Sequence, residues 1–481
     1  MKRPAIIALA IAVMLLSEGL VFMLFSNSAH ASSTWWDNNW SYRRQITIGP
    51  HPENYQIKVI IPPDIPKLDY PSIRFLENEN SGLLPYWIER AEDSYVNVAW
   101  VRRLENSDNS IWMYYGNPSA TSAENGDNTF LFWDDFGGPF NSSKWGKSGT
   151  GFDNYAYNIR LEDYSDATGK VEHGPGQGIQ YVSDMRTIEF RMKNSSSWRG
   201  GLVLTGPGSV SKETACIFDT PRFWTDSSQS NCESNKYYIL RTDLYGASKD
   251  KFISKFYYGE DNANYRDLVW TSPEKIQDWA PGDPSVDKYN LQAWDGGGSS
   301  SYYFDWFFVR KYVDPEPTVT IGPKQVPSPP INLVAGWNLV SFPVTSESST
   351  PDNLFPGQTY YIWRWDAVNK KYVSPSSTAP VELGVGYWIS VGGYGQTITT
   401  SGVPVDNYSE NLKNGWNLVG FPVTNENTTP DNLFPGQTYY IWRWDAVNKK
   451  YVSPSSAAPV ELGVGYWISV DHDQTITVPV V

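Results

Sequence analysis

An internal duplication constrains the fold of this chain more than any other feature of its sequence. The segment from Pro351 to Ser377 recurs without a single change as Pro430 to Ser456, 79 positions further on. Residues 331–405 and 406–481 are therefore two copies of one module. Because each copy alternates short apolar segments with turn residues, we expect both copies to be small β modules.

Aromatic and turn-forming residues predict the fold class of the remainder. The chain contains 22 Trp, 31 Tyr and 20 Phe, whose rings can bury large areas, so a disordered chain is excluded. Frequent Gly and Pro residues favour short strands joined by turns, which predicts an all-β protein. The formal net charge of −14 repels nucleic acid, and we expect no nucleic-acid partner.

The N-terminus has the pattern of an export signal. Lys2 and Arg3 precede an apolar run from Ala5 to Leu16, and a small-x-small site follows. We therefore expect residues 1–31 to be a signal peptide and the mature chain to be secreted or held at the cell surface. The alternative is an uncleaved membrane anchor, against which Glu18 argues because it interrupts the apolar segment.

Two further domains are expected before the repeats. Residues 32–128 consist of short β segments separated by turn residues, with no helical period, and predict a small β-sandwich. Residues 129–323 are rich in Gly and Asn turns, and their length suits a larger jelly roll. Residues 324–330 have the Pro-rich composition of a stiff linker.

Cys216 and Cys232 are the two cysteines of the chain. In an exported protein such a pair favours one disulfide, which would close a loop of about 17 residues and stabilise its domain by about 3 kcal/mol. Two free buried thiols are the alternative.

Three N-terminal motifs resemble one family. Trp40 to Ile48, Leu84 to Glu89 and Met113 to Pro118 are similar to the extracellular domain-of-unknown-function 2341 family. In that family a concanavalin-A-like jelly roll commonly follows, and the segments Asp134 to Trp145 and Phe304 to Arg310 resemble its first and last parts. The resemblance implies a location and a fold, and it supplies no catalytic residues.

The duplicated modules resemble repeats of archaeal and bacterial surface proteins. The matching motifs are Gly336 to Ser341, of the W-N-L-V-S-F-P type, and Gly384 to Trp388. The second copy departs from the first motif at Gly420, which stands where the first copy has Ser341.

The chain shows little sign of catalytic chemistry. The three histidines beyond the leader, His51, His173 and His472, are far apart in sequence, which argues against a Ser-His-Asp triad or a multi-histidine zinc site. The Glu-x-Asp-x-Glu spacing of jelly-roll glucanases is absent. We therefore expect no catalytic residues and no enzyme. The alternative is a polysaccharide-degrading hydrolase or lyase, for which the remaining candidate acids are Asp184, Glu189 and Asp219.

No cofactor is expected beyond a structural calcium ion. Asp134, Asp135 and Asp305 could supply oxygen ligands if the first and last strands of the jelly roll pair at one edge. The alternative is an ordinary acidic edge that discourages strand aggregation.

A row of aromatic side chains is the candidate ligand site of each module. The period of two places Tyr361, Trp363 and Trp365 on one strand face, and the second copy repeats the row with Tyr440, Trp442 and Trp444. Rings in such a row can stack on sugars. Alternatively, they fill the core of a module that has few aliphatic side chains.

These observations favour a non-catalytic secreted or cell-surface protein. We expect its partner to be a polysaccharide or another cell-envelope component, bound for adhesion, or the chain to be a structural subunit of a surface layer. A membrane contact is expected only through the N-terminal segment, if that segment stays uncleaved.

Overall fold

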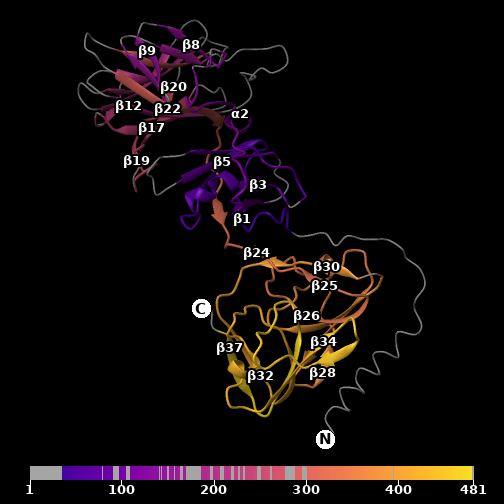
Figure 1. Cartoon of the computed structure of the whole chain (residues 1–481). Helices are drawn as coiled ribbons and strands as arrows, with labels where there is room; N and C mark the ends of the chain where they lie inside the picture. Colours follow the sequence, from indigo (N-terminus) through magenta and orange to yellow (C-terminus); the bar gives the residue numbers. More distant parts are fainter. Residues whose placement is uncertain are drawn as a thin grey trace. The chain divides into compact units, whose positions relative to one another are not determined.

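Antiparallel β-strands form most of the regular structure in the computed structural model (Figure 1). The expected all-β fold, with a sandwich, a jelly roll and two small modules, is confirmed. The structure describes residues 35–478 except 79, 90–96, 105–108, 140, 142, 149–150, 156–157, 163–165, 170–185, 195–198, 206–210, 218–221, 226–227, 231–232, 234, 246–250, 261–262, 277–287, 295–300 and 394, and in several strands between 146 and 302 it describes only the backbone.

The chain divides into two units, one of residues 39–323 and one that contains residues 324–481. The predicted signal peptide, residues 1–31, lies outside the described residues. In the part of the chain that the structure describes, no helix is both long enough and apolar enough to cross a membrane.

The N-terminal domain is a sandwich of two antiparallel sheets. One sheet has the order β23 (Val319–Ile321), β1 (Tyr42–Ile48), β6 (Ser110–Tyr115) and β3 (Arg74–Leu76). The other has the order β2 (Tyr55–Ile61), β5 (Asn97–Arg103) and β4 (Tyr86–Glu89). The short helices η2 (Lys67–Ser72) and α2 (Gly126–Thr129) connect elements of this region.

Alternation along the strands builds the core of this sandwich. Ile57, Val59 and Ile61 of β2 all point into the core, while Lys58 and Ile60 between them lie on the other face. Strand β23 was expected to belong to the jelly roll, but it pairs with β1, with Ile46 opposite Ile321. A three-residue strand carries no sequence signal for the sheet edge with which it will pair.

The larger domain is also a two-layer sandwich. Its first sheet, called the β12–β22 sheet below, has the order β19 (Leu268–Thr271), β18 (Lys251–Tyr258), β17 (Tyr237–Tyr245), β12 (Arg186–Asn194), β22 (Ser301–Lys311), β10 (Asn158–Glu162) and β9 (Gly151–Tyr155), with β20 (Lys275–Ile276) on β18 and β7 (Phe132–Asp134) on β22. Its second sheet has the order β16 (Ser228–Ser230), β15 (Arg222–Thr225), β14 (Ser211–Ile217), β13 (Arg199–Thr205), β21 (Lys288–Trp294), β11 (Asp166–Gly169) and β8 (Trp145–Ser148).

Strand β12 shows how the period of two divides this sheet into an inner and an outer face. Ile188, Phe190 and Met192 are buried in the core between the two sheets, where they meet Leu202 and Leu291 of the second sheet. The alternate residues of β12, Glu189 among them, therefore lie on the outer face.

Each repeat contains a sheet of the same topology. In the first repeat it has the order β26 (Gly336–Ser341), β29 (Gly386–Val391), β27 (Tyr360–Asp366) and β28 (Lys371–Val373), with helix α3 (Pro351–Leu354) and the pair β25 (Ile331–Leu333) and β30 (Gln396–Ile398). In the second it has the order β33 (Gly415–Val419), β36 (Tyr466–Val470), β34 (Tyr439–Asp445) and β35 (Lys450–Val452), with helix α4 (Pro430–Leu433) and the pair β32 (Tyr408–Leu412) and β37 (Gln474–Val478).

The predicted linker takes part in the first repeat. Within residues 324–330, strand β24 (Val326–Pro327) pairs with β31 (Ser401–Gly402). Ser328 continues the contact, because its backbone N–H donates to the carbonyl of Thr400 at 2.7 Å. The Pro-rich composition predicted only stiffness, whereas this segment joins the edge of a module.

The two repeats pack against each other through their aromatic faces. The indole N–H of Trp365 donates to the carbonyl of Trp416 at 2.9 Å, and Trp444 makes the equivalent bond to Trp337 at 3.0 Å. The ring of Trp365 lies 5.4 Å from that of Trp467, and the matching pair of the other copy has the same separation. The copies are thus related by an approximate two-fold axis, as in an isologous dimer.

The one departure between the copies in the W-N-L-V-S motif lies where the two repeats meet. A Cβ atom on Gly420 would fall 2.0 Å from the Cβ of Ser341. The Ser341 hydroxyl occupies that space and donates to the carbonyl of Val464 at 3.0 Å. Because the two-fold axis brings positions 341 and 420 together, the space between the repeats holds one side chain there and not two.

Candidate functional site

The outer face of the β12–β22 sheet is covered by the N-terminal sandwich. The side chains that join them are buried and come from β4, β5, β17, β22 and nearby loops: Trp87, Val98, Trp100, Phe130, Ile239, Tyr265, Trp306 and Phe308. Phe130 stacks on Phe308 with 4.3 Å between ring centroids. Buried side chains of both domains therefore fill this part of the outer face.

Glu189, the one candidate acid that the structure describes, lies inside this covered region. One oxygen of its carboxylate accepts from Arg266 Nη1 at 2.8 Å, and the other accepts from Arg310 Nη2 at 3.0 Å. Arg266 also bonds with Glu89 of β4, at 2.6 Å between Nη2 and Oε2. The network thus links both domains through charge-assisted hydrogen bonds.

These contacts leave Glu189 unsuited to proton transfer. Burial alone would raise the pKa of Glu189, but the guanidinium groups of Arg266 and Arg310 outweigh burial and hold the pKa well below its usual range. A general acid needs the opposite shift. Glu89 and Glu189 are buried carboxylates on either side of the Arg266 guanidinium, which bonds with both of them.

Other residues considered for catalysis lie apart from this network. Asp184, Asp219 and His173 are outside the described residues. His51 contacts Arg103, with 3.1 Å between His51 Nε2 and Arg103 Nη1, and His472 is exposed beside Asp471.

The three aspartates considered for calcium have other partners. Asp305 pairs with Arg191 at 2.5 Å, and Asp134 accepts from the indole N–H of Trp145 at 2.7 Å. Asp135 accepts from the backbone N–H of Gly137 at 3.1 Å. In the described part of the chain, no three His, Cys, Asp or Glu side chains are grouped as a metal site would require. A structural calcium ion stays a prediction.

The cysteine pair cannot be placed. Cys216 belongs to β14, of which only the backbone is described, and Cys232 lies outside the described residues. The disulfide stays a prediction.

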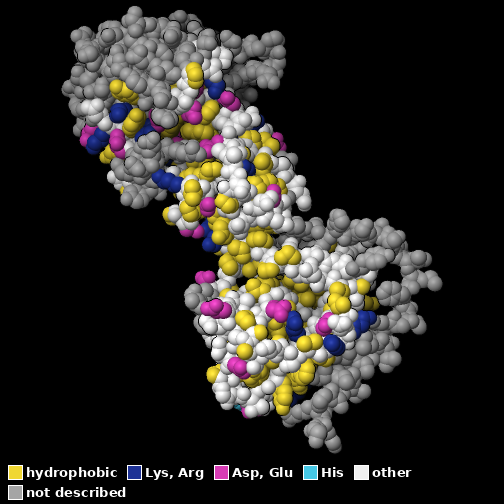
Figure 2. Space-filling model, viewed as in Figure 1, with side chains coloured by type: hydrophobic (Ala, Val, Ile, Leu, Met, Phe, Trp, Pro, Cys, Tyr) yellow, Lys and Arg dark blue, Asp and Glu magenta, His cyan; other side chains and the backbone are white. Residues whose placement is uncertain are grey.

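The structure divides each aromatic row between packing and exposure. Trp363 and Trp365, with Trp442 and Trp444, pack against the cluster between the repeats. The remaining rings, Tyr361 and Tyr440, are each 58% exposed. The row is therefore neither wholly exposed nor wholly buried in the core of its own module, and ligand binding at these rings stays a prediction. On the surface visible in Figure 2, the described charged side chains of the repeats are scattered among uncharged ones.

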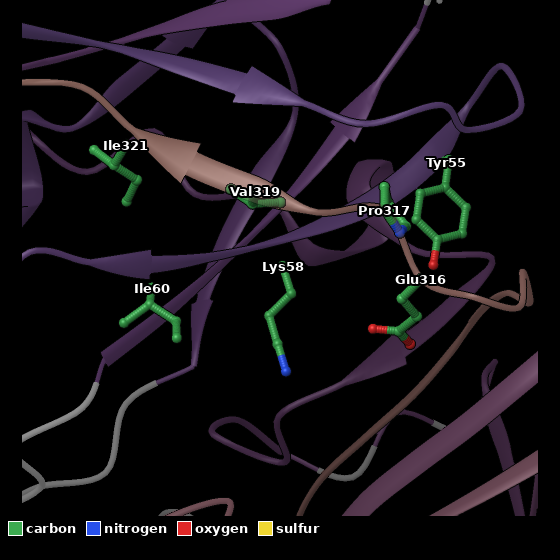
Figure 3. Close-up of a pocket in the computed structure, with 7 residues that line it drawn as sticks. All are labelled: Tyr55, Lys58, Ile60, Glu316, Pro317, Val319 and Ile321. Atoms are coloured by element: carbon green, nitrogen blue, oxygen red, sulfur yellow. The ribbon is translucent and has the colours of Figure 1, made fainter.

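A pocket of about 290 Å³ lies between two edge strands of the N-terminal sandwich (Figure 3). Lys58 and Ile60 reach it from β2, and β23 and the segment before it supply the opposite wall. The full lining is Tyr55, Lys58, Ile60, Glu316, Pro317, Val319 and Ile321. The pocket therefore combines an ammonium group, a carboxylate and a phenol with an apolar wall.

The carboxylate of Glu316 and the ammonium of Lys58 differ in how far protein groups neutralise them. Glu316 Oε1 accepts from Arg310 and forms an ion pair with Arg241, at 2.7 Å from Arg241 Nη1, while no hydrogen bond or ion pair of Oε2 occurs among the described residues. Burial first and Arg266 second lower the pKa of the half-buried Lys58. Within the described residues, no carboxylate lies at ion-pair distance from the Lys58 ammonium.

Sequence reasoning missed this pocket. One signal was present, because Lys58 interrupts the otherwise apolar end of β2, Ile57 to Ile61. The other wall comes from residues 316–321, which lie more than 250 positions away. Nothing in either segment predicts that the two meet.

The comparisons with known proteins support the N-terminal domain. A family model described as a domain of unknown function (DUF2341) matches residues 69–148. No curated protein matches the chain.

The solved structures that match this chain are remote in sequence. The lectin-like defence protein arcelin-5 from Phaseolus vulgaris is 7% identical, with 38% of this chain and 98% of that chain covered and a TM-score of 0.27. A seed lectin of Lotus tetragonolobus is 8% identical, with coverages of 38% and 95% and a TM-score of 0.25. A GH43 glycoside hydrolase with an engineered active site is 12% identical, with coverages of 50% and 53% and a TM-score of 0.26. At these values the likenesses assign neither a ligand nor a reaction.

Proposed function

We propose that this chain is a non-catalytic secreted or cell-surface protein that binds a glycan of the cell envelope or of its surroundings. The observation that carries the proposal is the covered outer face of the β12–β22 sheet. There the N-terminal sandwich fills the space above β22, and two arginines hold Glu189 as a carboxylate. A general acid on a polysaccharide must exchange a proton with its substrate, whereas Glu189, the one candidate acid described on this face, is buried and paired with two arginines.

Binding requires less of the surface than catalysis does. A shallow site needs an apolar patch and a few polar groups that exchange hydrogen bonds with hydroxyls. The described surface offers such groups at the pocket beside Lys58 and at the exposed rings of Tyr361 and Tyr440. Because the repeats pack as one body, these two rings are held in one fixed arrangement.

Retention of the mature chain on immobilised polysaccharides and on isolated cell envelope tests the proposal. We expect the folded protein to be retained on at least one acidic or neutral polysaccharide and released by the soluble form of the same polymer. A folded, monodisperse protein that passes through every matrix unretained would remove the binding function and leave a purely structural role.

A further inference from the structure

The pocket beside Lys58 has the features of a ligand site. The arginines of the buried network and its acids satisfy one another: Arg266 and Arg310 bind Glu189, and Arg310 also binds Glu316. Lys58 lies at the edge of this network and adds a positive charge that no described carboxylate pairs. A half-buried ammonium without a counter-ion favours an anion supplied from outside.

The other pocket walls limit which anion can enter. Glu316 presents a carboxylate oxygen, Oε2, that has no described protein partner, so it can accept from a ligand hydroxyl. The same negative charge disfavours a dianion such as phosphate, because among the described residues Lys58 is the one cation that lines the pocket. The ligand should therefore carry a single negative charge and at least one hydroxyl donor.

The size and the apolar wall of the pocket limit the ligand further. Ile60 is 53% exposed and lines the pocket with Pro317, Val319 and Ile321. A patch of this kind suits the C–H face of a sugar ring, and about 290 Å³ is near the lower limit of ordinary ligand pockets. This volume suits one or two sugar units and not a long segment of chain.

We propose that the pocket between β2 and residues 316–321 binds a carboxylate-bearing sugar unit. The Lys58 ammonium pairs with the sugar carboxylate, Glu316 Oε2 accepts from a hydroxyl, and the wall formed by Ile60 and Val319 packs against the ring. This assignment rests on the proposed glycan-binding function and names the class of sugar that this site takes.

Ligand-observed NMR titration of the mature chain with methyl β-D-glucuronide and methyl β-D-glucoside tests the assignment, since the two probes differ only at C6, which is a carboxylate in the first and a hydroxymethyl group in the second. We expect the glucuronide to bind roughly tenfold more tightly than the glucoside, as a single charge-assisted pair allows. Lys58→Gln should remove this preference, and Lys58→Arg should keep most of it. Lys67→Gln, at an exposed position of the same domain, is the matched control and should behave as the wild type.

Equal affinity for both probes, or an unchanged glucuronide affinity in Lys58→Gln, would overturn the assignment. If Lys58→Gln unfolds the domain, the probe comparison on the wild type and on Lys58→Arg still decides. The outcome is separable from that of the proposed function. A chain that is retained on polysaccharide equally well with Lys58→Gln binds glycans elsewhere, whereas a chain that binds glucuronide but no polymer lacks the proposed function.

Discussion

Glu316 shows how single ionised side chains stabilise the contact between the two N-terminal domains. Burial would raise its pKa, but Arg310 and Arg241 lower the pKa to about 2, from an ordinary value near 4.5. Such a shift stabilises the folded state fully at pH values above the unfolded pKa, where the carboxylate is charged in both states, because the charge is held more favourably in the folded protein.

The free energy of unfolding should therefore depend on acid pH. Since the folded pKa lies below the unfolded one, this stabilisation is complete above about pH 5 and is lost as the pH falls toward 2, by about 3 kcal/mol in total. Urea unfolding of residues 39–323 within the mature chain, measured from pH 7 to pH 2, checks this. Glu316→Gln should make the pH dependence shallower without abolishing it, because Glu189 contributes in the same direction, and an identical slope in this variant would refute the role of Glu316.

Ser341 and Gly420 show how one residue can decide the pairing of two near-identical modules. A second hydroxymethyl group at position 420 would overlap the first, because the two Cβ atoms would lie 2.0 Å apart. We expect Gly420→Ser to destabilise the module pair by about 1–3 kcal/mol, as overpacking does.

Hydrogen exchange at the amides of Ser341 and Gly420 measures this effect within the whole chain, since these amides donate to Gly463 and Gly384 of the opposite repeat. Exchange at both should accelerate in Gly420→Ser. The double variant Ser341→Gly with Gly420→Ser moves the side chain to the other copy and should restore protection. Failure of the double variant to recover would mean that the damage lies within one module and not at the axis.

Strands β27 and β34 are the elements that join the repeats. Each contributes one tryptophan whose indole N–H donates to a carbonyl of the opposite copy, Trp365 to Trp416 and Trp444 to Trp337. The rest of each strand contributes to its own module, as Ile362 and Ile441 do in the two cores. One strand therefore serves the module core on one face and the pair on the other.

Trp365→Phe and Trp444→Phe should destabilise the pair equally, by about 1 kcal/mol each, because each loses one equivalent hydrogen bond and keeps most of the ring contact. Chemical unfolding, monitored by hydrogen exchange at residues 336–341 and 415–419, compares the stability of the two variants. Tyr361→Phe, at an exposed ring of the same strand, is the control and should have little effect. A clear effect of one tryptophan and none of the other would contradict the two-fold arrangement.

The sequence predicted the elements better than it predicted their partners. The duplication and the turn residues were enough to expect two small β modules, and Trp363 and Trp365, which the period of two places on one face of β27, both pack between the repeats. The sequence could not predict that the other repeat covers this aromatic face, because an exposed row of rings and a buried row show the same alternation of residues along the strand. The difference at Gly420 was visible, but it acquires a meaning only when Ser341 is seen beside it.

The candidate site was predictable only in part for the same reason. Glu189 was recognised as an acid on a strand, yet its partners Arg266 and Arg310 are 77 and 121 positions away. The walls of the Lys58 pocket are separated even further along the chain. Long-range pairing determines whether a carboxylate is free or neutralised, and no local pattern reports it.

At the scale of the whole molecule, the chain combines contact surfaces with a covered jelly-roll face. Its domains along residues 39–323 are joined by aromatic packing and by the Glu89–Arg266–Glu189 bridge. The repeats form a second body in which two aromatic faces seal each other. The sequence patterns placed a candidate acid on the jelly-roll face and candidate ligand-binding rings on the repeats. In the structure, both surfaces are largely used for packing.

We propose that this protein binds glycans without cleaving them, and measuring retention and product release in one experiment tests this proposal most directly. The mature chain is incubated with each polysaccharide that retains it, and reducing ends and unsaturated ends are quantified over time against a heat-denatured control. We predict retention with no release of either product above that control. Sustained product release that disappears in Glu189→Gln, in a variant shown to remain folded, would contradict the account.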